Sequence, residues 1–469
     1  MFRRIVTLSL AAAFLAGCSM APRYSRPDAP VPASWPTGPA YQSGAAPAGE
    51  TAAADLQWSR FFVNPQLQKL IGLALANNRD LRVAALNVEK SRARFRIRRA
   101  DQLPTVEAAG SGVVQRLPAD LSPTGEAMIS RNYNLSLGLS SYEIDFFGRI
   151  RSLTDQALQQ FLATEQARRS FQVGLVAEVG NNYLTLAADR ERLELARDTL
   201  ANQKAAYGLV QSRFAAGAAS QLDLRQAQTS VDSARGDVAR FTGLVAQDEN
   251  LLALVVGAQV PTALLPTGLG AAENLRELPP GVPSEVLQRR PDVMQAELEL
   301  MAANANIGAA RAAFFPRITL NSAIGTSSSQ LSGLFAPGSL AWGFVPQITL
   351  PIFDSGRNKA GLASAERDRD IFLARYEETI QSAFREVADA LALNGTVGEQ
   401  LQAQQSLTDA SSESYLLAQA RYHGGVTSYL NVLDAQRSFY AAQQGLISVK
   451  FTRLGNLITL YKVLGGGSE

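Results

Sequence analysis

One stretch of this sequence occurs twice, and this repeat constrains the fold more than any other feature. Residues 213–228, RFAAGAASQLDLRQAQ, return as residues 421–436, RYHGGVTSYLNVLDAQ, at an offset of 208 residues. In each copy a Gly and a Ser precede a helix-forming run, which predicts a turn followed by a helix N-cap. We therefore expect two halves of one design, each with a helical hairpin that bends at the same place.

Long stretches without proline surround both copies of the repeat. No proline lies between Pro123 and Pro261, and none follows Pro351. Apolar residues recur there at spacings of three and four, as in Val176, Val179 and Tyr183. This spacing indicates the seam of a coiled coil. The sequence thus predicts helical hairpins over residues 148–256 and 356–464.

Four shorter segments alternate apolar with polar or small residues, which predicts strands that have one apolar face. They cover, approximately, residues 105–115, 132–145, 317–328 and 340–352. Strands of about ten residues are long enough to cross an outer membrane. Four strands cannot close on themselves, however, and open sheet edges are not tolerated in lipid. Several chains would have to combine: a dimer gives eight strands with a filled interior, and a trimer gives twelve with room for a pore.

These patterns divide the chain into two repeats and three connecting or targeting segments. Repeat 1 is expected over residues 61–260 and repeat 2 over residues 292–464. A proline-rich linker, residues 261–291, joins them. The segment 18–60 is rich in Pro, Ala and Gly, which predicts an extended tether.

The N-terminus has the features of a bacterial export signal over residues 1–17. Arg3 and Arg4 precede an apolar run that is too short to cross a bilayer. The sequence Leu-Ala-Gly-Cys that ends at Cys18 resembles the lipobox of bacterial lipoproteins, which implies cleavage before Cys18 and acylation of that residue. Cys18 is the only cysteine, so a disulfide within the chain is excluded. Ser19 in the next position indicates an outer-membrane destination within that lipoprotein class.

Composition argues against an enzyme, a metal centre and a nucleic-acid partner. The whole chain contains one His and one Cys, which leaves little for metal sites or nucleophilic catalysis. Without residues 1–17, Lys and Arg equal Asp and Glu at 42 each, so there is no basic excess. We expect no cofactor apart from the lipid on Cys18.

Several motifs together resemble the TolC-type outer-membrane factors, and most closely the lipidated branch that serves resistance-nodulation-division (NodT-like) efflux systems. The motifs are Phe146-Phe-Gly-Arg149, Phe353-Asp-Ser-Gly-Arg357, Arg289-Arg-Pro-Asp-Val293 and Tyr429-Leu-Asn-Val-Leu-Asp-Ala-Gln-Arg437. The resemblance implies an α+β membrane channel: a homotrimer whose transmembrane β-barrel has twelve strands, four from each chain, continued by a long α-helical periplasmic barrel. It also implies docking to a periplasmic adapter fed by an inner-membrane pump. The expected function is a passive exit channel in the Gram-negative outer membrane.

The same resemblance places a gate at the periplasmic turns. Leu430 and Asp434 match the positions that form the constriction, and a ring of three Asp side chains suits a cation-selective narrowing. Arg437 is expected to hold the closed state by ion pairing, and Leu222 and Asp223 of the first copy to contribute nearby. The first copy has Gln226 where the second has Asp434. The turns that include Gly217, Ser220, Gly425 and Ser428 are expected to face the adapter.

Two other functions remain open from the sequence. One is the outer-membrane duct of a type I protein-secretion system. The other is a lipoprotein that forms a coiled-coil spacer without a pore. The four alternating strands argue against the spacer, because a spacer needs none.

Overall fold

The computed structural model describes residues 19–41, 56–272, 275, 278 and 283–466. The expected signal segment and Cys18 lie outside the described residues. The chain forms two compact units: unit 1 combines 1–28, 87–165 and 295–376, and unit 2 combines 29–86, 166–294 and 377–469. Each unit takes residues from both sequence repeats. The repeats are therefore not separate compact bodies.

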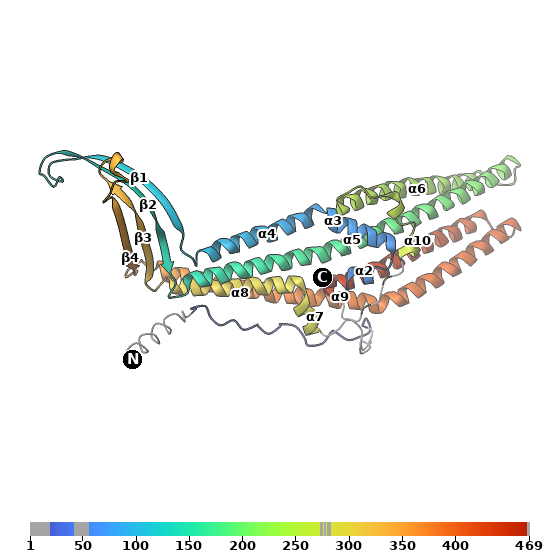
Figure 1. The fold of residues 1–469 in the computed structure, drawn as a ribbon. Coiled ribbons are helices and arrows are strands. Elements are labelled where there is room, and N and C mark those ends of the chain that lie inside the picture. Colours follow the sequence, from blue (N-terminus) through green and yellow to red (C-terminus); the bar gives the residue numbers. More distant parts are fainter. Residues whose placement is uncertain (1–18, 42–55, 273–274, 276–277, 279–282, 467–469) are drawn as a thin grey trace. The chain divides into compact units, whose positions relative to one another are not determined.

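The chain alternates long helices with two pairs of strands (Figure 1). The helices are α2 (Trp58–Phe61), α3 (Pro65–Asn77), α4 (Arg79–Ala100), α5 (Arg149–Ala215), α6 (Gln221–Val256), α7 (Pro283–Arg289), α8 (Pro291–Ala312), α9 (Arg357–His423) and α10 (Tyr429–Val463). The strands are β1 (Val106–Leu117), β2 (Met128–Ile144), β3 (Arg317–Ser328) and β4 (Leu340–Thr349). None of the helices described here combines the length and the apolar character needed to cross a membrane.

The four strands form one antiparallel sheet in unit 1, in the order β1-β2-β3-β4. The central pair, β2 and β3, joins the two repeats, with Leu137 opposite Ile324. The two strands approach so closely at Gly325 that an added Cβ would clash with the Leu135 carbonyl oxygen. The outer edges of β1 and β4 pair with no other strand in the described part of the chain.

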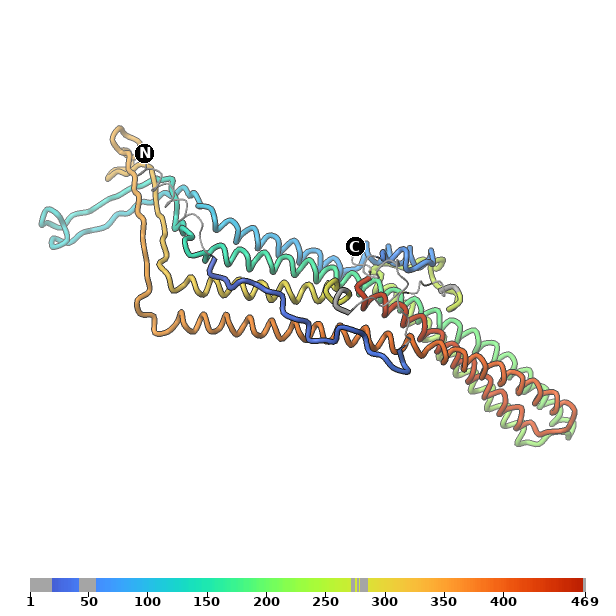
Figure 2. The backbone as a smooth tube through the Cα atoms, turned by 90° about the horizontal axis from the view of Figure 1, so that it is seen from below, coloured from blue at the N-terminus to red at the C-terminus, as the bar shows by residue number. Residues whose placement is uncertain are grey.

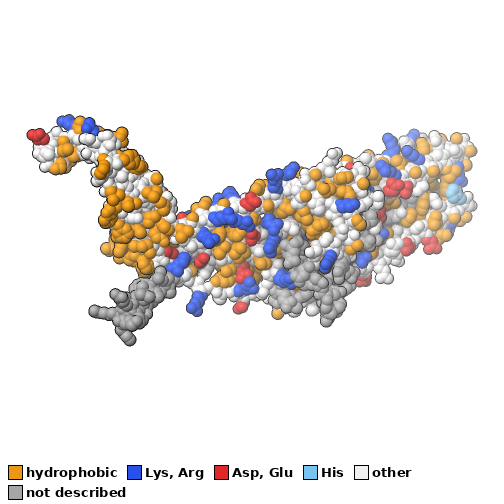
Figure 3. Space-filling view, in the orientation of Figure 1, with side chains coloured by type: hydrophobic (Ala, Val, Ile, Leu, Met, Phe, Trp, Pro, Cys, Tyr) orange, Lys and Arg blue, Asp and Glu red, His pale blue; other side chains and the backbone are white. Residues whose placement is uncertain are grey.

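One face of the sheet presents large apolar side chains to solvent. Trp342, Phe344 and Ile348 alternate along β4 and are all more than half exposed. Figure 3 shows hydrophobic side chains gathered over the strands. Exposed apolar surface of this extent marks a face that contacts lipid or another protein.

Charged and capping residues fix the base of this sheet in unit 1. Glu143, at the end of β2, accepts hydrogen bonds from Arg149 at 2.6 Å and pairs with Arg317 at 2.6 Å. Asp145 accepts the backbone N–H groups of Ile150 and Arg151 at the start of α5. The glycine of the Phe-Phe-Gly-Arg motif, Gly148, has φ 72°, a conformation that glycine adopts without strain. This motif therefore forms the strand-to-helix corner.

The core of unit 2 contains residues from α3, α5, α6 and α10. Phe61 stacks on Tyr461 at 4.2 Å between ring centroids, and the Tyr461 hydroxyl donates to the Leu56 carbonyl at 2.7 Å. Leu56 is buried and Trp58 begins helix α2, so the end of the expected tether (18–60) belongs to this core.

The expected linker, 261–291, contains regular structure. Helix α7 occupies Pro283–Arg289, and short 3₁₀ helices occupy Thr262–Leu264 and Leu269–Ala272. Leu269 is fully buried, and its N–H donates to Glu191 at 3.1 Å. The prolines did not exclude helix here, because proline is well tolerated in the first turn of a helix.

Candidate functional site

The first helical turn is built by its own sequence. Helix α5 ends at Ala215, Gly217 takes φ 74°, and the Ala218 N–H donates to the Arg213 carbonyl at 2.8 Å. Ser220 then caps α6: its hydroxyl oxygen accepts the Asp223 N–H at 3.1 Å, and Asp223 accepts the Ser220 N–H at 3.0 Å. This reciprocal pair is a capping box. The predicted turn and N-cap are confirmed in the first copy.

The second turn repeats the backbone path but not the cap. Gly425 takes φ 73°, and the Val426 N–H donates to the Arg421 carbonyl at 2.9 Å, the bond equivalent to that in the first turn. Ser428 holds the N-cap conformation without a side-chain hydrogen bond. The third residue of α10 is Asn431, not an acid, and its amide donates to Thr427 instead. The predicted turn and N-cap position are therefore confirmed in the second copy as well, but the Ser428 side chain makes no cap bond.

Unit 2 brings the two turns together, and both hairpin ends lie side by side in Figures 1 and 2. Buried residues of both hairpins form one apolar cluster beneath the turns, which consists of Val210, Ala227, Tyr429, Val432 and Leu433. The Arg213 guanidinium lies over the Tyr422 ring at 4.9 Å, a cation–π contact between equivalent ends of the two repeats. The repeated stretches thus meet at one site that is continuous across both hairpins.

The three second-copy residues predicted for the gate lie on one exposed face of α10. Leu430, Asp434 and Arg437 follow at spacings of four and three, which places them on successive turns of the same face. The Leu430 side chain is 45% exposed, although its neighbours Tyr429 and Leu433 are buried. Asp434 pairs with Arg437 at 3.8 Å, and both side chains are mostly exposed. An exposed leucine beside this acid is available to contact another chain or the channel interior.

The first-copy residues have a different setting. Leu222 is 66% exposed and is the counterpart of Leu430. Asp223 accepts from the Ser220 backbone and hydroxyl, so its carboxylate serves the helix cap. This role of Asp223 differs from the predicted gate contribution, although the spacing Ser-x-x-Asp is the signal of a capping box.

Two tyrosines near the turns, Tyr429 and Tyr440, also have contacts that the sequence did not predict. Tyr429 is 4% exposed and its hydroxyl has no hydrogen-bond partner among the described residues. Burial, together with Tyr422, Tyr415 and Asp223, raises the pKa of Tyr429 to about 12. Tyr440 of α10 donates to Asp237 of α6 at 3.2 Å, and Arg240 also binds this carboxylate. No sequence signal links these two partners, because they lie 203 residues apart.

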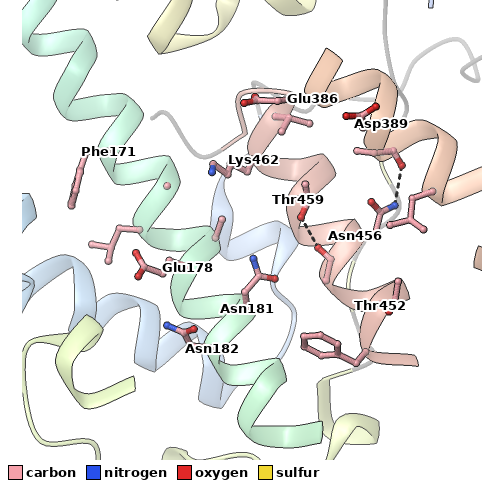
Figure 4. Close-up of a pocket in the computed structure, with 18 residues that line it drawn as sticks. Phe171, Glu178, Asn181, Asn182, Glu386, Asp389, Thr452, Asn456, Thr459 and Lys462 are labelled. Carbon is pink, nitrogen blue, oxygen red and sulfur yellow. Dashed lines mark hydrogen bonds between the residues drawn. The ribbon is translucent and has the colours of Figure 1, made fainter. Parts of the chain in front are cut away.

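A groove of about 910 Å³ opens between α5, α9 and α10, also within unit 2 (Figure 4). Polar side chains line much of it, including Glu178, Asn181, Glu386, Asp389 and Lys462. Asn456 donates to the Ala390 carbonyl at 3.0 Å and holds α10 to α9. Within the described ranges there is no group of three or more His, Cys, Asp or Glu side chains that could hold a metal ion.

Comparisons with known proteins agree on one family. The sequence model described as "Outer membrane efflux protein" matches residues 70–258 and 282–466. The toluene efflux pump outer membrane protein TtgC of Pseudomonas putida is 49% identical over 467 residues, which cover 100% of this chain and 96% of TtgC.

Solved structures give the same result. A membrane protein from Pseudomonas aeruginosa shares 45% identity at a TM-score of 0.90, over 96% of this chain and 98% of that chain. The open state of the Neisseria gonorrhoeae MtrE outer membrane channel shares 38% identity at a TM-score of 0.87, over 96% and 99% of the two chains. The family resemblance seen in the sequence is thereby confirmed, and efflux is favoured over a secretion duct or a spacer without a pore.

Proposed function

The chain belongs to the outer membrane efflux protein family, and on that premise we propose that it is the exit channel of a tripartite efflux pump in the Gram-negative outer membrane. The channel conducts substrates passively from the periplasmic side to the exterior. It is not an enzyme. The observation that carries this proposal is the sheet of unit 1, which combines an exposed apolar face with two outer edges that no other described strand pairs.

These two edges support a trimer. Exposed N–H and C=O groups at a sheet edge are costly in lipid, so each edge needs a partner strand. The edge of β1 in one chain can pair with the edge of β4 in the next chain. In a trimer this pairing occurs three times around a threefold axis and closes the ring. Three chains then contribute twelve strands, enough to leave a pore.

The turns of unit 2 support the docking and gating part of the proposal. The turns that contain Gly217, Ser220, Gly425 and Ser428 face a periplasmic adapter, which is fed by an inner-membrane pump of the resistance-nodulation-division type. Three copies each of Leu430 and Asp434 form the constriction, and Arg437 holds the closed state through Asp434. Within one chain Arg437 lies 3.8 Å from Asp434, and both side chains stay mostly exposed, which leaves them accessible to a neighbouring chain.

The lipid on Cys18 is also part of the proposal. Several acyl chains anchor a protein stably in a bilayer, since each buried methylene contributes about 0.8 kcal/mol. The residues that follow Cys18 contact helix α8 in unit 1, the helix that leads into β3. The first described residues therefore lie near the end of α8 that leads into the sheet, which we place in the same membrane.

Complementation of efflux tests the proposed function. The chain is expressed, together with an adapter and a pump of the resistance-nodulation-division type, in a Gram-negative strain that lacks its own outer-membrane efflux channel. We expect lower accumulation of a fluorescent pump substrate than in cells that express adapter and pump alone. Equal accumulation in the two strains would reject the channel function.

A further inference from the structure

The first described residues of the chain follow helix α8 in a regular register. Within unit 1, the Arg26 guanidinium pairs with Glu297 at 2.7 Å, Asn304 donates to the Pro22 carbonyl at 2.8 Å, and Arg311 donates to the Met20 carbonyl at 3.4 Å. The three α8 partners are spaced by seven residues, about two helical turns or roughly 10 Å each. The tether therefore runs antiparallel to α8, and its N-terminal end lies at the C-terminal end of that helix.

Glycine at position 308 permits this close approach. A Cβ at Gly308 would lie 2.6 Å from the Ala21 backbone nitrogen and 2.6 Å from the Ser152 hydroxyl oxygen. The tether backbone thus packs directly on the helix backbone. This contact fixes Ala21 against α8, and the adjacent Met20 accepts a hydrogen bond from Arg311 near the end of that helix.

An apolar cavity lies at that position. It has a volume of about 530 Å³ and is lined by Met20, Arg311, Phe314, Phe315 and Leu362. Phe314 and Phe315 are each about 40% exposed, although both are large apolar side chains. They occupy the segment between α8 and β3, so the cavity adjoins the start of the sheet.

We propose that this cavity binds an acyl chain of the lipid carried by Cys18. Cys18 lies outside the described residues, but only two residue steps separate it from Met20, and a chain of that length spans at most about 7 Å. An acyl chain suits the lining, because four of the five lining side chains are apolar. This inference rests on the proposed lipidation of Cys18 and adds a defined site for one chain of the lipid. The occupied site holds the anchor at the base of the sheet.

Photocrosslinking of the intact, full-length protein tests the site. Cells that produce it are fed a palmitate analogue with a diazirine and an alkyne, and then irradiated. We expect crosslinks in the tryptic peptides 312–317 and 360–367, which contain Phe314, Phe315 and Leu362. Before irradiation the Cys18→Ala variant should carry no label, because phospholipid that contains the analogue is not bound covalently to the protein. A labelled protein with crosslinks only to phospholipid or to other peptides overturns the cavity but not the lipidation, whereas a protein without label overturns both.

A pair of matched substitutions on α9 provides a second measurement. Leu362→Ser removes an apolar wall of the cavity and should lower the crosslink yield in peptide 312–317 about fivefold. Ile371→Ser, an exposed residue of the same helix that does not line the cavity, should leave the yield unchanged. Equal yields in the two variants would overturn the proposal.

Discussion

At the scale of single residues, the two copies of the turn differ in how their acids are used. Asp223 is bound to the cap of α6, whereas Asp434 is exposed and pairs only weakly with Arg437. Exposed ion pairs contribute about 0–1 kcal/mol, so Asp434 can exchange this partner for an ion or another chain at little cost. The difference between Gln226 and Asp434 therefore places the proposed gate on the second copy.

Removal of the proposed constriction should open the channel. We expect Leu430→Ala with Asp434→Ala to raise single-channel conductance in a planar bilayer, because the variant loses both the apolar ring and the acidic ring. Asp434→Ala alone should reduce cation selectivity. Gln226→Ala, the equivalent change in the first copy, is the control and should alter neither property. Conductance at the wild-type level in the double variant would remove the gate from these residues.

The unequal caps give a second prediction at this scale. Ser220→Ala should destabilise the first turn of α6 by about 0.5–2 kcal/mol, because the Asp223 N–H loses its bond to the Ser220 hydroxyl, although the Ser220 N–H can still donate to the Asp223 carboxylate. Ser428→Ala should have a smaller effect on α10, because the Ser428 side chain makes no cap bond. The rate of hydrogen exchange at the backbone amides in the first turn of α6 and of α10 measures the two effects. Equal acceleration in the two helices would contradict the difference in capping.

At the scale of elements, polar contacts between buried faces hold the long helices together. Arg190 of α5 binds Glu249 of α6 at 2.6 Å, and Arg192 of α5 pairs with Asp189 at 2.7 Å and donates to Ser448 of α10 at 3.0 Å. Asp248 of α6 interacts with the Asp189 carboxyl group in the same region. Burial, and then Asp189, raises the pKa of Asp248 to about 6, from 3.8. We therefore expect the stability of the packing between α5 and α6 to depend on pH.

The sign of this dependence follows from linkage. Because the folded state raises the pKa of Asp248, its contribution to stability is fully present below about pH 4 and is lost as the pH rises through about 6. We expect Asp248→Asn to raise the melting temperature at pH 7.5 and to change it little at pH 4. Asp232→Asn, on the same helix at an exposed pair with Arg235, is the control and should show no such difference. An equal rise in the melting temperature of Asp248→Asn at pH 7.5 and at pH 4 would show that the charge on Asp248 does not limit stability.

At the scale of the whole molecule, assembly depends on the register of one sheet shared by both repeats. The close approach of β2 and β3 at Gly325 leaves no room for a side chain, whereas a Cβ on Gly110 would meet the Leu135 side chain at 3.7 Å, an ordinary contact. The pairing of β2 with β3 joins the two strand pairs into one sheet. In this sheet β1 and β4 form the outer edges, where we propose that neighbouring chains pair.

A substitution at that contact should therefore affect the oligomer. We expect Gly325→Val to reduce the yield of trimer extracted from outer membranes, because the β2–β3 register cannot form without a backbone shift. Gly110→Ala should leave the trimer intact. Semi-native electrophoresis measures both variants. Wild-type trimer yield from Gly325→Val would show that this register is not required for assembly.

Local sequence patterns predicted much of the fold. The repeat identified both turns, and the spacing of three and four residues identified long helices, because each signal lies within a few residues along the chain. The alternating segments identified four strands per chain, and the second of them begins at Met128, four residues before its expected start. Family membership and the efflux function were also predicted correctly from the motifs. The gate and the lipid on Cys18 remain predictions.

The sequence by itself determined the turns, the helix lengths and the strand faces, because glycine conformation, capping and hydrophobic period act over short distances. Only the tertiary structure decided which of these elements meet. In the structure β2 pairs with β3 across the two repeats, and the tether lies on α8. The first turn contacts the second through Arg213 and Tyr422. These contacts join residues up to about 280 positions apart, and each depends on complementary shape and charge, which leave no periodic signal in one sequence.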